Sequence, residues 1–141
     1  MTHPAVRPGV GIDLAERATF SHLDDGAIRR AADRWLQPGE RTWCAAQASL
    51  REALVTVLSC KEAVFKAFSP APDCHRLSLT MHGEGSSGWA ALDGIEPDLV
   101  TVSWEISGAS ILTLAVASPS GRARNLLGEL APGLPRSRRG G

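Results

Sequence analysis

The first half of the chain has the hydrophobic spacing of helices, after one short apolar segment at the start. Residues 6–14 are mostly apolar and contain glycines that allow close backbone approach, which predicts a first strand. Apolar positions over residues 27–36 recur with helical spacing, and a Pro-Gly pair stops this helix. Helical spacing resumes over residues 40–68, with a break expected near 48–49. Two or three helices therefore follow the strand.

The second half changes to short β-rich segments separated by glycines and prolines. Strands are predicted at residues 75–81, 89–92, 99–106 and 111–118, with a hairpin turn at 107–109 joining the last two. A strand, then helices, then antiparallel strands is typical of an α+β arrangement. We predict a single α+β domain with helices packed on a small antiparallel sheet.

The composition is that of one globular domain. At 141 residues and 43% hydrophobic content, the chain can bury a substantial core. The apolar runs are too short for a membrane span, and the first residues lack the order of a signal peptide, so we expect a cytoplasmic protein that does not enter membranes. Cys44, Cys60 and Cys74 have no CxxC spacing, which favours reduced and mostly buried thiols over a disulfide or zinc site.

Charge is unevenly distributed along the chain, although the net charge is zero. Residues 1–118 carry 10 Lys and Arg against 14 Asp and Glu, a net charge of −4, whereas residues 119–141 carry 5 Arg and 1 Glu, a net charge of +4. The acidic body argues against nucleic-acid binding. We predict a domain over 1–118 and a largely disordered basic tail over 119–141, or a tail that touches phosphates or an acidic partner.

Candidate chemistry lies in two distant segments. Lys61 and Lys66 are the only lysines beside 13 arginines, and both flank Glu62 in the most apolar helical segment. Asp13, at the end of the first predicted strand, is followed by Glu16. Mg²⁺ binds one or two protein carboxylates together with substrate phosphates, and lysine is a compact phosphate donor. The combination indicates a divalent-metal phosphate site; a turn aspartate and a surface ion pair are the alternative interpretation.

The two segments together resemble a known family. Gly11-Ile12-Asp13-Leu14-Ala15-Glu16 and Ser59-Cys60-Lys61-Glu62-Ala63-Val64-Phe65-Lys66-Ala67 are similar to the paired motifs of the 4′-phosphopantetheinyl transferases. The chain length and the early aspartate resemble the small holo-acyl-carrier-protein synthase type. The second motif is similar to that of the longer, two-module type that serves polyketide and peptide synthases.

The resemblance implies a reaction and its residues. Coenzyme A would donate 4′-phosphopantetheine to a serine of an acyl or peptidyl carrier protein and leave as 3′,5′-ADP. Asp13 and Glu62 would hold Mg²⁺, with Glu16 lining the site or ligating through water. Lys66 would neutralise the pyrophosphate and protonate the leaving group, and Lys61 would contact phosphate as well. The serine proton would go to Glu62 or to a metal-bound water.

The resemblance also implies partners. Arg29, Arg30 and Arg34 on the first predicted helix would dock the acidic recognition helix of the carrier protein, a solvated helix face being the alternative. Because family members of this length usually place the site between subunits, we expect a homotrimer. Half of a pseudo-dimer is the alternative assembly.

Two departures from the family pattern leave other functions open. The segment before Lys61 lacks the arginine that small synthases often carry, and Trp104 stands where many members have a histidine. Trp104 is expected in the core or an interface, with adenine stacking as the alternative. A non-catalytic carrier-binding or assembly subunit is therefore the second interpretation. A different Mg²⁺-dependent phosphate enzyme is the third, although the chain has no Walker-type glycine-rich loop.

Overall fold

The computed structural model describes residues 7–68 and 76–130. The elements in chain order are β1 (Gly9–Glu16), α1 (Asp25–Trp35), α2 (Pro38–Ala45), α3 (Leu50–Phe68), β2 (Leu79–Glu84), β3 (Ser87–Leu92), β4 (Val100–Ser107), β5 (Ser110–Ala117) and α4 (Ala123–Leu130). Within the two described ranges, no helix has both the length and the apolar character needed to cross a membrane.

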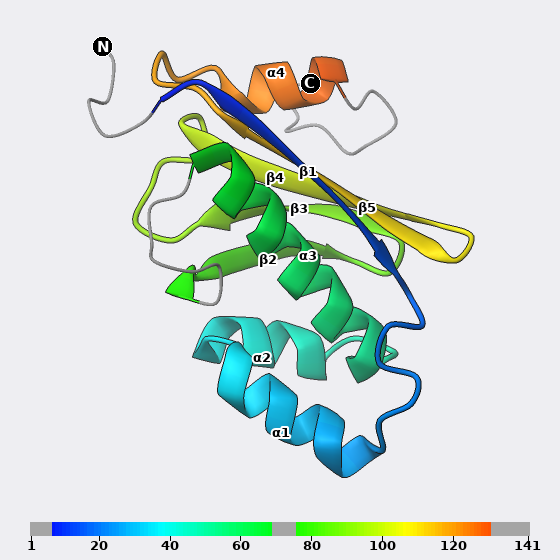
Figure 1. Cartoon of the computed structure of the whole chain (residues 1–141). Helices are drawn as coiled ribbons and strands as arrows, with labels where there is room; N and C mark the ends of the chain where they lie inside the picture. Colours follow the sequence, from blue (N-terminus) through cyan, green and yellow to red (C-terminus); the bar gives the residue numbers. More distant parts are fainter. Residues whose placement is uncertain (1–6, 69–75, 131–141) are drawn as a thin grey trace.

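The strands form one antiparallel sheet in the order β1-β5-β4-β3-β2. The long helix α3 crosses one face of this sheet, and α1 and α2 lie together beside the N-terminal part of α3 (Figure 1). The first strand therefore pairs with the last one, Asp13 opposite Thr113, which makes β1 an edge strand. The predicted α+β class, with helices on a small antiparallel sheet, is confirmed.

Local sequence signals explain where the helices begin and end. The Asp24 carboxylate accepts a hydrogen bond of 2.8 Å from the backbone N–H of Ala27 and caps α1. Pro38 is the first residue of α2, where a missing N–H costs nothing. The expected break near residues 48–49 separates α2 from α3. The strand β2 begins at Leu79, four residues after the start at residue 75 that the sequence predicts.

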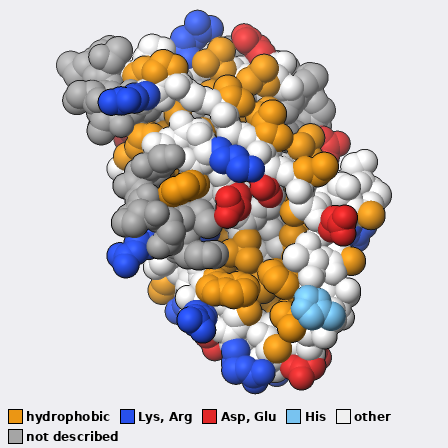
Figure 2. All heavy atoms as spheres, viewed as in Figure 1, with side chains coloured by type: hydrophobic (Ala, Val, Ile, Leu, Met, Phe, Trp, Pro, Cys, Tyr) orange, Lys and Arg blue, Asp and Glu red, His pale blue; other side chains and the backbone are white. Residues whose placement is uncertain are grey.

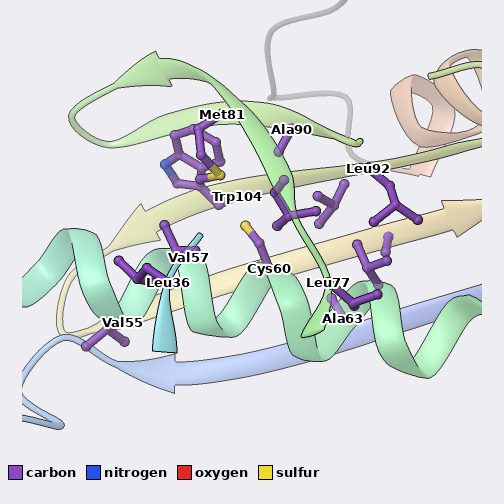
Figure 3. Close-up of a cluster of buried hydrophobic side chains, with 14 of the residues drawn as sticks. Leu36, Val55, Val57, Cys60, Ala63, Leu77, Met81, Ala90, Leu92 and Trp104 are labelled. Atoms are coloured by element: carbon purple, nitrogen blue, oxygen red, sulfur yellow. The ribbon is translucent and has the colours of Figure 1, made fainter. Parts of the chain in front are cut away.

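The core lies between α3 and the sheet, where apolar side chains from both meet (Figure 3). Val57, Cys60 and Ala63 of α3 are completely buried, as is Trp104 of β4. Trp104 packs edge-on against Trp43, with ring centroids 5.4 Å apart. The expectation of a core tryptophan is therefore confirmed, and its ring is not available for stacking on adenine.

The thiols in the described part of the chain are structural. Cys44 and Cys60 are free and buried, as predicted, whereas Cys74 lies outside the described residues. Burial raises the pKa of Cys44 to about 12 and moves the pKa of Cys60 further in the same direction. Both groups therefore stay protonated at neutral pH and are poor nucleophiles.

Two glycines allow β1 to lie directly against α3. A Cβ atom on Gly11 would stand 1.9 Å from the carbonyl oxygen of Ala63, and one on Gly9 would stand 2.3 Å from that of Ala67. Both distances are far below van der Waals contact, so any side chain would push the strand away from the helix. Gly9 and Gly11 thus set how closely Asp13 approaches α3.

The domain extends further than the sequence predicts. Helix α4 lies on the sheet face opposite α3, where its Ala123 and Leu127 pack on Val116. Arg124 forms an ion pair of 2.6 Å with Asp98 and ties the helix to the turn before β4. The predicted boundary at residue 118 is therefore wrong, since folded structure continues to residue 130. The disorder predicted for residues 131–141 lies outside the described residues.

Candidate metal and phosphate site

Asp13 lies where β1 passes over the middle of α3. Its Oδ2 accepts a hydrogen bond of 2.6 Å from the Ser59 hydroxyl, which is also 3.0 Å from the hydroxyl of Thr113. Thr113 stands opposite Asp13 on β5, so the neighbouring strand buttresses the same contact. The Asp13 side chain is only 20% exposed, and this polar cluster holds it in place.

Lys66 lies seven residues after Ser59 on α3, about two helical turns, and reaches the same carboxylate. Its ammonium donates to the backbone carbonyl of Ile12 at 3.0 Å and to Asp13 Oδ1 at 3.3 Å. The Lys66 side chain is half exposed, so its positive charge faces solvent beside the carboxylate. The two carboxylate oxygens of Asp13 are thus shared between a hydroxyl and an ammonium, both from α3.

Glu62 lies between these two contacts on the same helix. At about 100° per residue, positions 59, 62 and 66 fall within a narrow sector of the α-helix surface. Because Ser59 and Lys66 both touch Asp13, this sector faces β1. Glu62 is half-buried. Figure 2 shows acidic and basic side chains side by side on this face, over the middle of α3, and β1 runs alongside this helix in Figure 1.

The donor set suits Mg²⁺ bound together with a substrate. In the described ranges no group of three or more His, Cys, Asp or Glu side chains is close enough to hold a metal by itself. Mg²⁺ rarely uses such a cage; it takes one or two carboxylates and completes its shell with water and phosphate oxygens. Asp13 and Glu62 would provide those carboxylates, and Lys66 adds a cation where phosphate charge would accumulate.

Glu16 does not join this group within one chain. Side chains alternate between the two faces of a strand, so positions 13 and 16 of β1 point to opposite faces. Glu16 is exposed at the end of the strand, opposite Ser110 of β5. The expectation that Glu16 lines the Asp13 site therefore needs correction, because the two residues lie three positions apart along an extended backbone.

Lys61 is placed differently from the phosphate contact that the sequence suggests. Its side chain is 0% exposed and its ammonium lies 2.6 Å from the carboxylate of Glu40, also 0% exposed. The ammonium also donates to the carbonyl of Trp35 at 3.2 Å. A buried charge needs such a partner. Lys61 is thus part of the interior beneath α1 and α2, and the expected phosphate contact is corrected.

Ser59 and Thr113 are the site residues that the sequence analysis missed. Ser59 opens the second motif, and its spacing to Glu62 and Lys66 predicts one helix face, which was a usable signal. Thr113 carries no such signal, because only the pairing of the first strand with the last one brings it to Asp13. The exposed positions of Arg29, Arg30 and Arg34 on α1 match the solvent-facing positions expected for them.

Comparisons with known proteins identify a family and a shared fold. The 4′-phosphopantetheinyl transferase superfamily profile matches residues 9–98. A search of curated protein sequences gives no match. Among solved structures, the acyl carrier protein synthase of Mycobacterium tuberculosis superposes with a TM-score of 0.53 at 24% identity, over 79% of this chain and 96% of its own.

Two further synthase structures extend the likeness. The holo-[acyl-carrier-protein] synthase of Neisseria meningitidis gives a TM-score of 0.58 at 19% identity, over 78% of this chain and 97% of its own. The Helicobacter pylori enzyme, solved in complex with coenzyme A, gives 0.57 at 16% identity, over 77% and 99%. These likenesses show a shared fold. The family match over most of the folded domain adds that this chain belongs to the 4′-phosphopantetheinyl transferase superfamily.

Proposed function

We propose that this protein is a Mg²⁺-dependent holo-acyl-carrier-protein synthase, which transfers 4′-phosphopantetheine from coenzyme A to a serine of an acyl or peptidyl carrier protein. The observation that carries the proposal is the position of Asp13, which contacts Ser59 and Lys66 on either side of Glu62. This arrangement gathers two carboxylates and an ammonium at one surface, as expected for a pyrophosphate donor.

Each side chain has a distinct role in this proposal. Mg²⁺, when bound by Asp13 and Glu62, would neutralise charge on the pyrophosphate of coenzyme A. Lys66 would exchange its contact with Asp13 for a pyrophosphate oxygen and return a proton to the departing 3′,5′-ADP. The serine oxygen would bond to the β-phosphorus while the bond from the β-phosphorus to the bridging oxygen breaks, and that oxygen leaves with the α-phosphate of 3′,5′-ADP. Glu62 would accept the serine proton. Ser59 would keep Asp13 oriented throughout.

A homotrimer is proposed from the outer face of the sheet. The exposed large hydrophobic side chains of β1 and β5 are Val10 (53%), Ile12 (57%), Leu14 (68%) and Leu112 (47%). They form the apolar stripe, which follows β1 along its length, and Figure 2 shows a band of hydrophobic side chains there. Contiguous apolar surface of this kind marks an interaction site in a folded protein. Association through the stripe would bring a second chain against β1, on the strand face opposite Asp13.

The test uses the full chain with coenzyme A, Mg²⁺ and an apo carrier protein, and follows the mass of the carrier. A gain equal to phosphopantetheine, dependent on Mg²⁺ and lost with EDTA, is the expected result. Binding of coenzyme A or of the carrier without any mass gain would contradict the enzyme and favour the non-catalytic carrier-binding subunit. Transfer that proceeds equally in EDTA would reject the metal but keep the transferase.

A further inference from the structure

The helix α1 carries the exposed arginines, and residues of α3 attach it to the rest of the domain. Its buried side chains are small in number: Ile28 and Ala32 face the core, and Trp35 makes a ring contact with Phe20. A hollow of about 260 Å³ separates the first half of α1 from the start of α3. The apolar attachment of α1 therefore depends mainly on Ile28 and Ala32, and polar contacts at its two ends add to it.

Arg51 of α3 holds the N-terminal end of α1. One guanidinium nitrogen donates to the carbonyl oxygen of Phe20, at 3.1 Å, and to that of Leu23. The other terminal nitrogen forms an ion pair of 2.8 Å with Asp25, the first residue of α1. One planar donor fork thus joins the loop that leads into α1 and the helix itself.

Lys61 of α3 holds the other end. Its ammonium donates to the carbonyl of Trp35, the last residue of α1, and pairs with Glu40 of α2. Glu40 also accepts the backbone N–H groups of Gln37, at 2.8 Å, and of Leu79, at 2.7 Å. The buried pair therefore connects the end of α1, the start of α2, the middle of α3 and the start of β2.

The spacing of these two contacts matches the helix that they hold. Arg51 and Lys61 are ten residues apart on α3, which corresponds to about 15 Å at the helical rise per residue. The 11 residues of α1 span about 16 Å by the same rule. The same helix α3 carries Ser59, Glu62 and Lys66 on another side, against β1. One rigid element thus bears both the attachment of α1 and the candidate site.

We propose that Arg51 and the buried pair of Lys61 and Glu40 are positioning residues, which hold α1 at a fixed place relative to the Asp13 site. The inference rests on the proposed function, in which the exposed arginines of α1 dock the carrier protein. An α1 that moves would still leave the Asp13 contacts intact, because they are made by Ser59 and Lys66 of α3. The carrier serine, however, would reach the pyrophosphate less often.

The experiment compares Arg51→Met with the double variant Glu40→Gln/Lys61→Met, in the full-length protein. Arg51 is partly exposed, so its removal leaves a folded protein, and the double change avoids an unpaired buried charge. Arg124→Met is the matched control, since it removes an arginine–aspartate pair on α4. Each variant is assayed for kcat and for the KM values of coenzyme A and of apo carrier, and α1 is followed by hydrogen exchange.

The positioning role predicts a specific pattern. The KM for apo carrier rises about tenfold in both variants, whereas the KM for coenzyme A stays at the wild-type value. Amide exchange over residues 25–35 becomes faster while α3 stays protected. The Arg124→Met control changes neither. An unchanged carrier KM, or equal rises in both KM values, would overturn the proposal.

Failure of the proposed function gives a different result. A wild-type protein that transfers nothing to any apo carrier would reject that function, together with the effect on carrier KM. The exchange measurement needs no activity and would still decide about the attachment of α1: exchange over residues 25–35 that is unchanged in both variants would overturn it.

Discussion

The Ser59 hydroxyl of α3 donates a 2.6 Å hydrogen bond to the carboxylate of Asp13 on β1. Forty-six residues separate the two in the chain. The contact fixes the face of α3 that meets the strand, and the same face carries Glu62 and Lys66. The two sequence motifs are therefore joined by a polar contact as well as by close backbone packing, and each can be tested by substitution.

Glu62→Gln should abolish most transfer without loss of the fold. Gln keeps the size of the half-buried side chain but removes the charge needed for a metal and for proton acceptance. We expect kcat to fall by about 10²–10³-fold, a typical loss for one electrostatic group at an active site. Carrier mass and unfolding by urea are measured on the same sample. Glu129→Gln, exposed on α4, is the control, and full activity of Glu62→Gln would contradict the assignment.

Gly11→Ala should destabilise the domain and separate the two motifs. The added Cβ would stand 1.9 Å from the carbonyl oxygen of Ala63, so β1 must move away from α3. We expect the free energy of unfolding to fall by about 3 kcal/mol, the upper range for overpacking. Gly39→Ala is the matched control, because nothing lies within 4 Å of a Cβ there and alanine favours the helix by about 1 kcal/mol. Equal stability of both variants would refute the close-approach argument.

The buried ion pair of Lys61 and Glu40 also leads to a prediction about stability, which is separate from its proposed positioning role. Lys61→Met alone leaves the Glu40 carboxylate without its cation in a fully buried place. The free energy of unfolding should fall by about 3–5 kcal/mol. Adding Glu40→Gln removes the stranded charge, so the double variant should recover most of this loss, as seen by urea denaturation. If the double variant were no more stable than Lys61→Met, the two charges would not depend on each other.

Much of the fold follows from the sequence, and the exceptions have physical causes. Helical spacing and Pro-Gly punctuation predict two or three helices after the first strand, and the glycine-rich turns predict the antiparallel strands. Leu77 is buried in the segment predicted as a strand but lies outside the strand pairs of the described residues, so burial there did not indicate pairing. The helix α4 is short, and its few apolar residues stand among arginines and glycines in the sequence. The composition of this segment therefore indicated a tail.

The candidate site was partly predictable for a similar reason. A single helix face follows from spacing alone, which places Glu62 with Lys66. The partner of a buried charge does not follow from spacing, since Glu40 is brought to Lys61 only by the packing of α2 against α3. The alternation of side chains along β1 separates Glu16 from Asp13, whereas the packing of the sheet decides which of the two faces α3.

Acid should remove the small contribution of the Asp98–Arg124 ion pair to the free energy of unfolding. The hydrogen bond from Arg124 lowers the pKa of Asp98 below its ordinary value in the folded protein. The stabilisation is therefore complete above the unfolded pKa, near 4, and is lost as pH falls through the lowered folded pKa. Because both side chains are substantially exposed, Arg124→Met should cost less than about 1 kcal/mol at pH 7. Urea unfolding should show this difference from wild type shrink and then vanish as the pH falls below the ordinary pKa of an aspartate; a difference that grows in acid would reverse the sign.

Leu14→Glu should convert the proposed trimer to a monomer. Leu14 is the most exposed member of the apolar stripe, at 68%, and its side chain points away from α3. A carboxylate there leaves the isolated fold unaffected but would be buried without a partner in an interface. Light scattering after size-exclusion chromatography should give a trimer for wild type and a monomer for the variant, with transfer reduced if the site lies between subunits. Leu130→Glu provides the comparison, since Leu130 is 55% exposed but lies on α4 outside the stripe. A trimer that survives Leu14→Glu would exclude the apolar stripe as the interface.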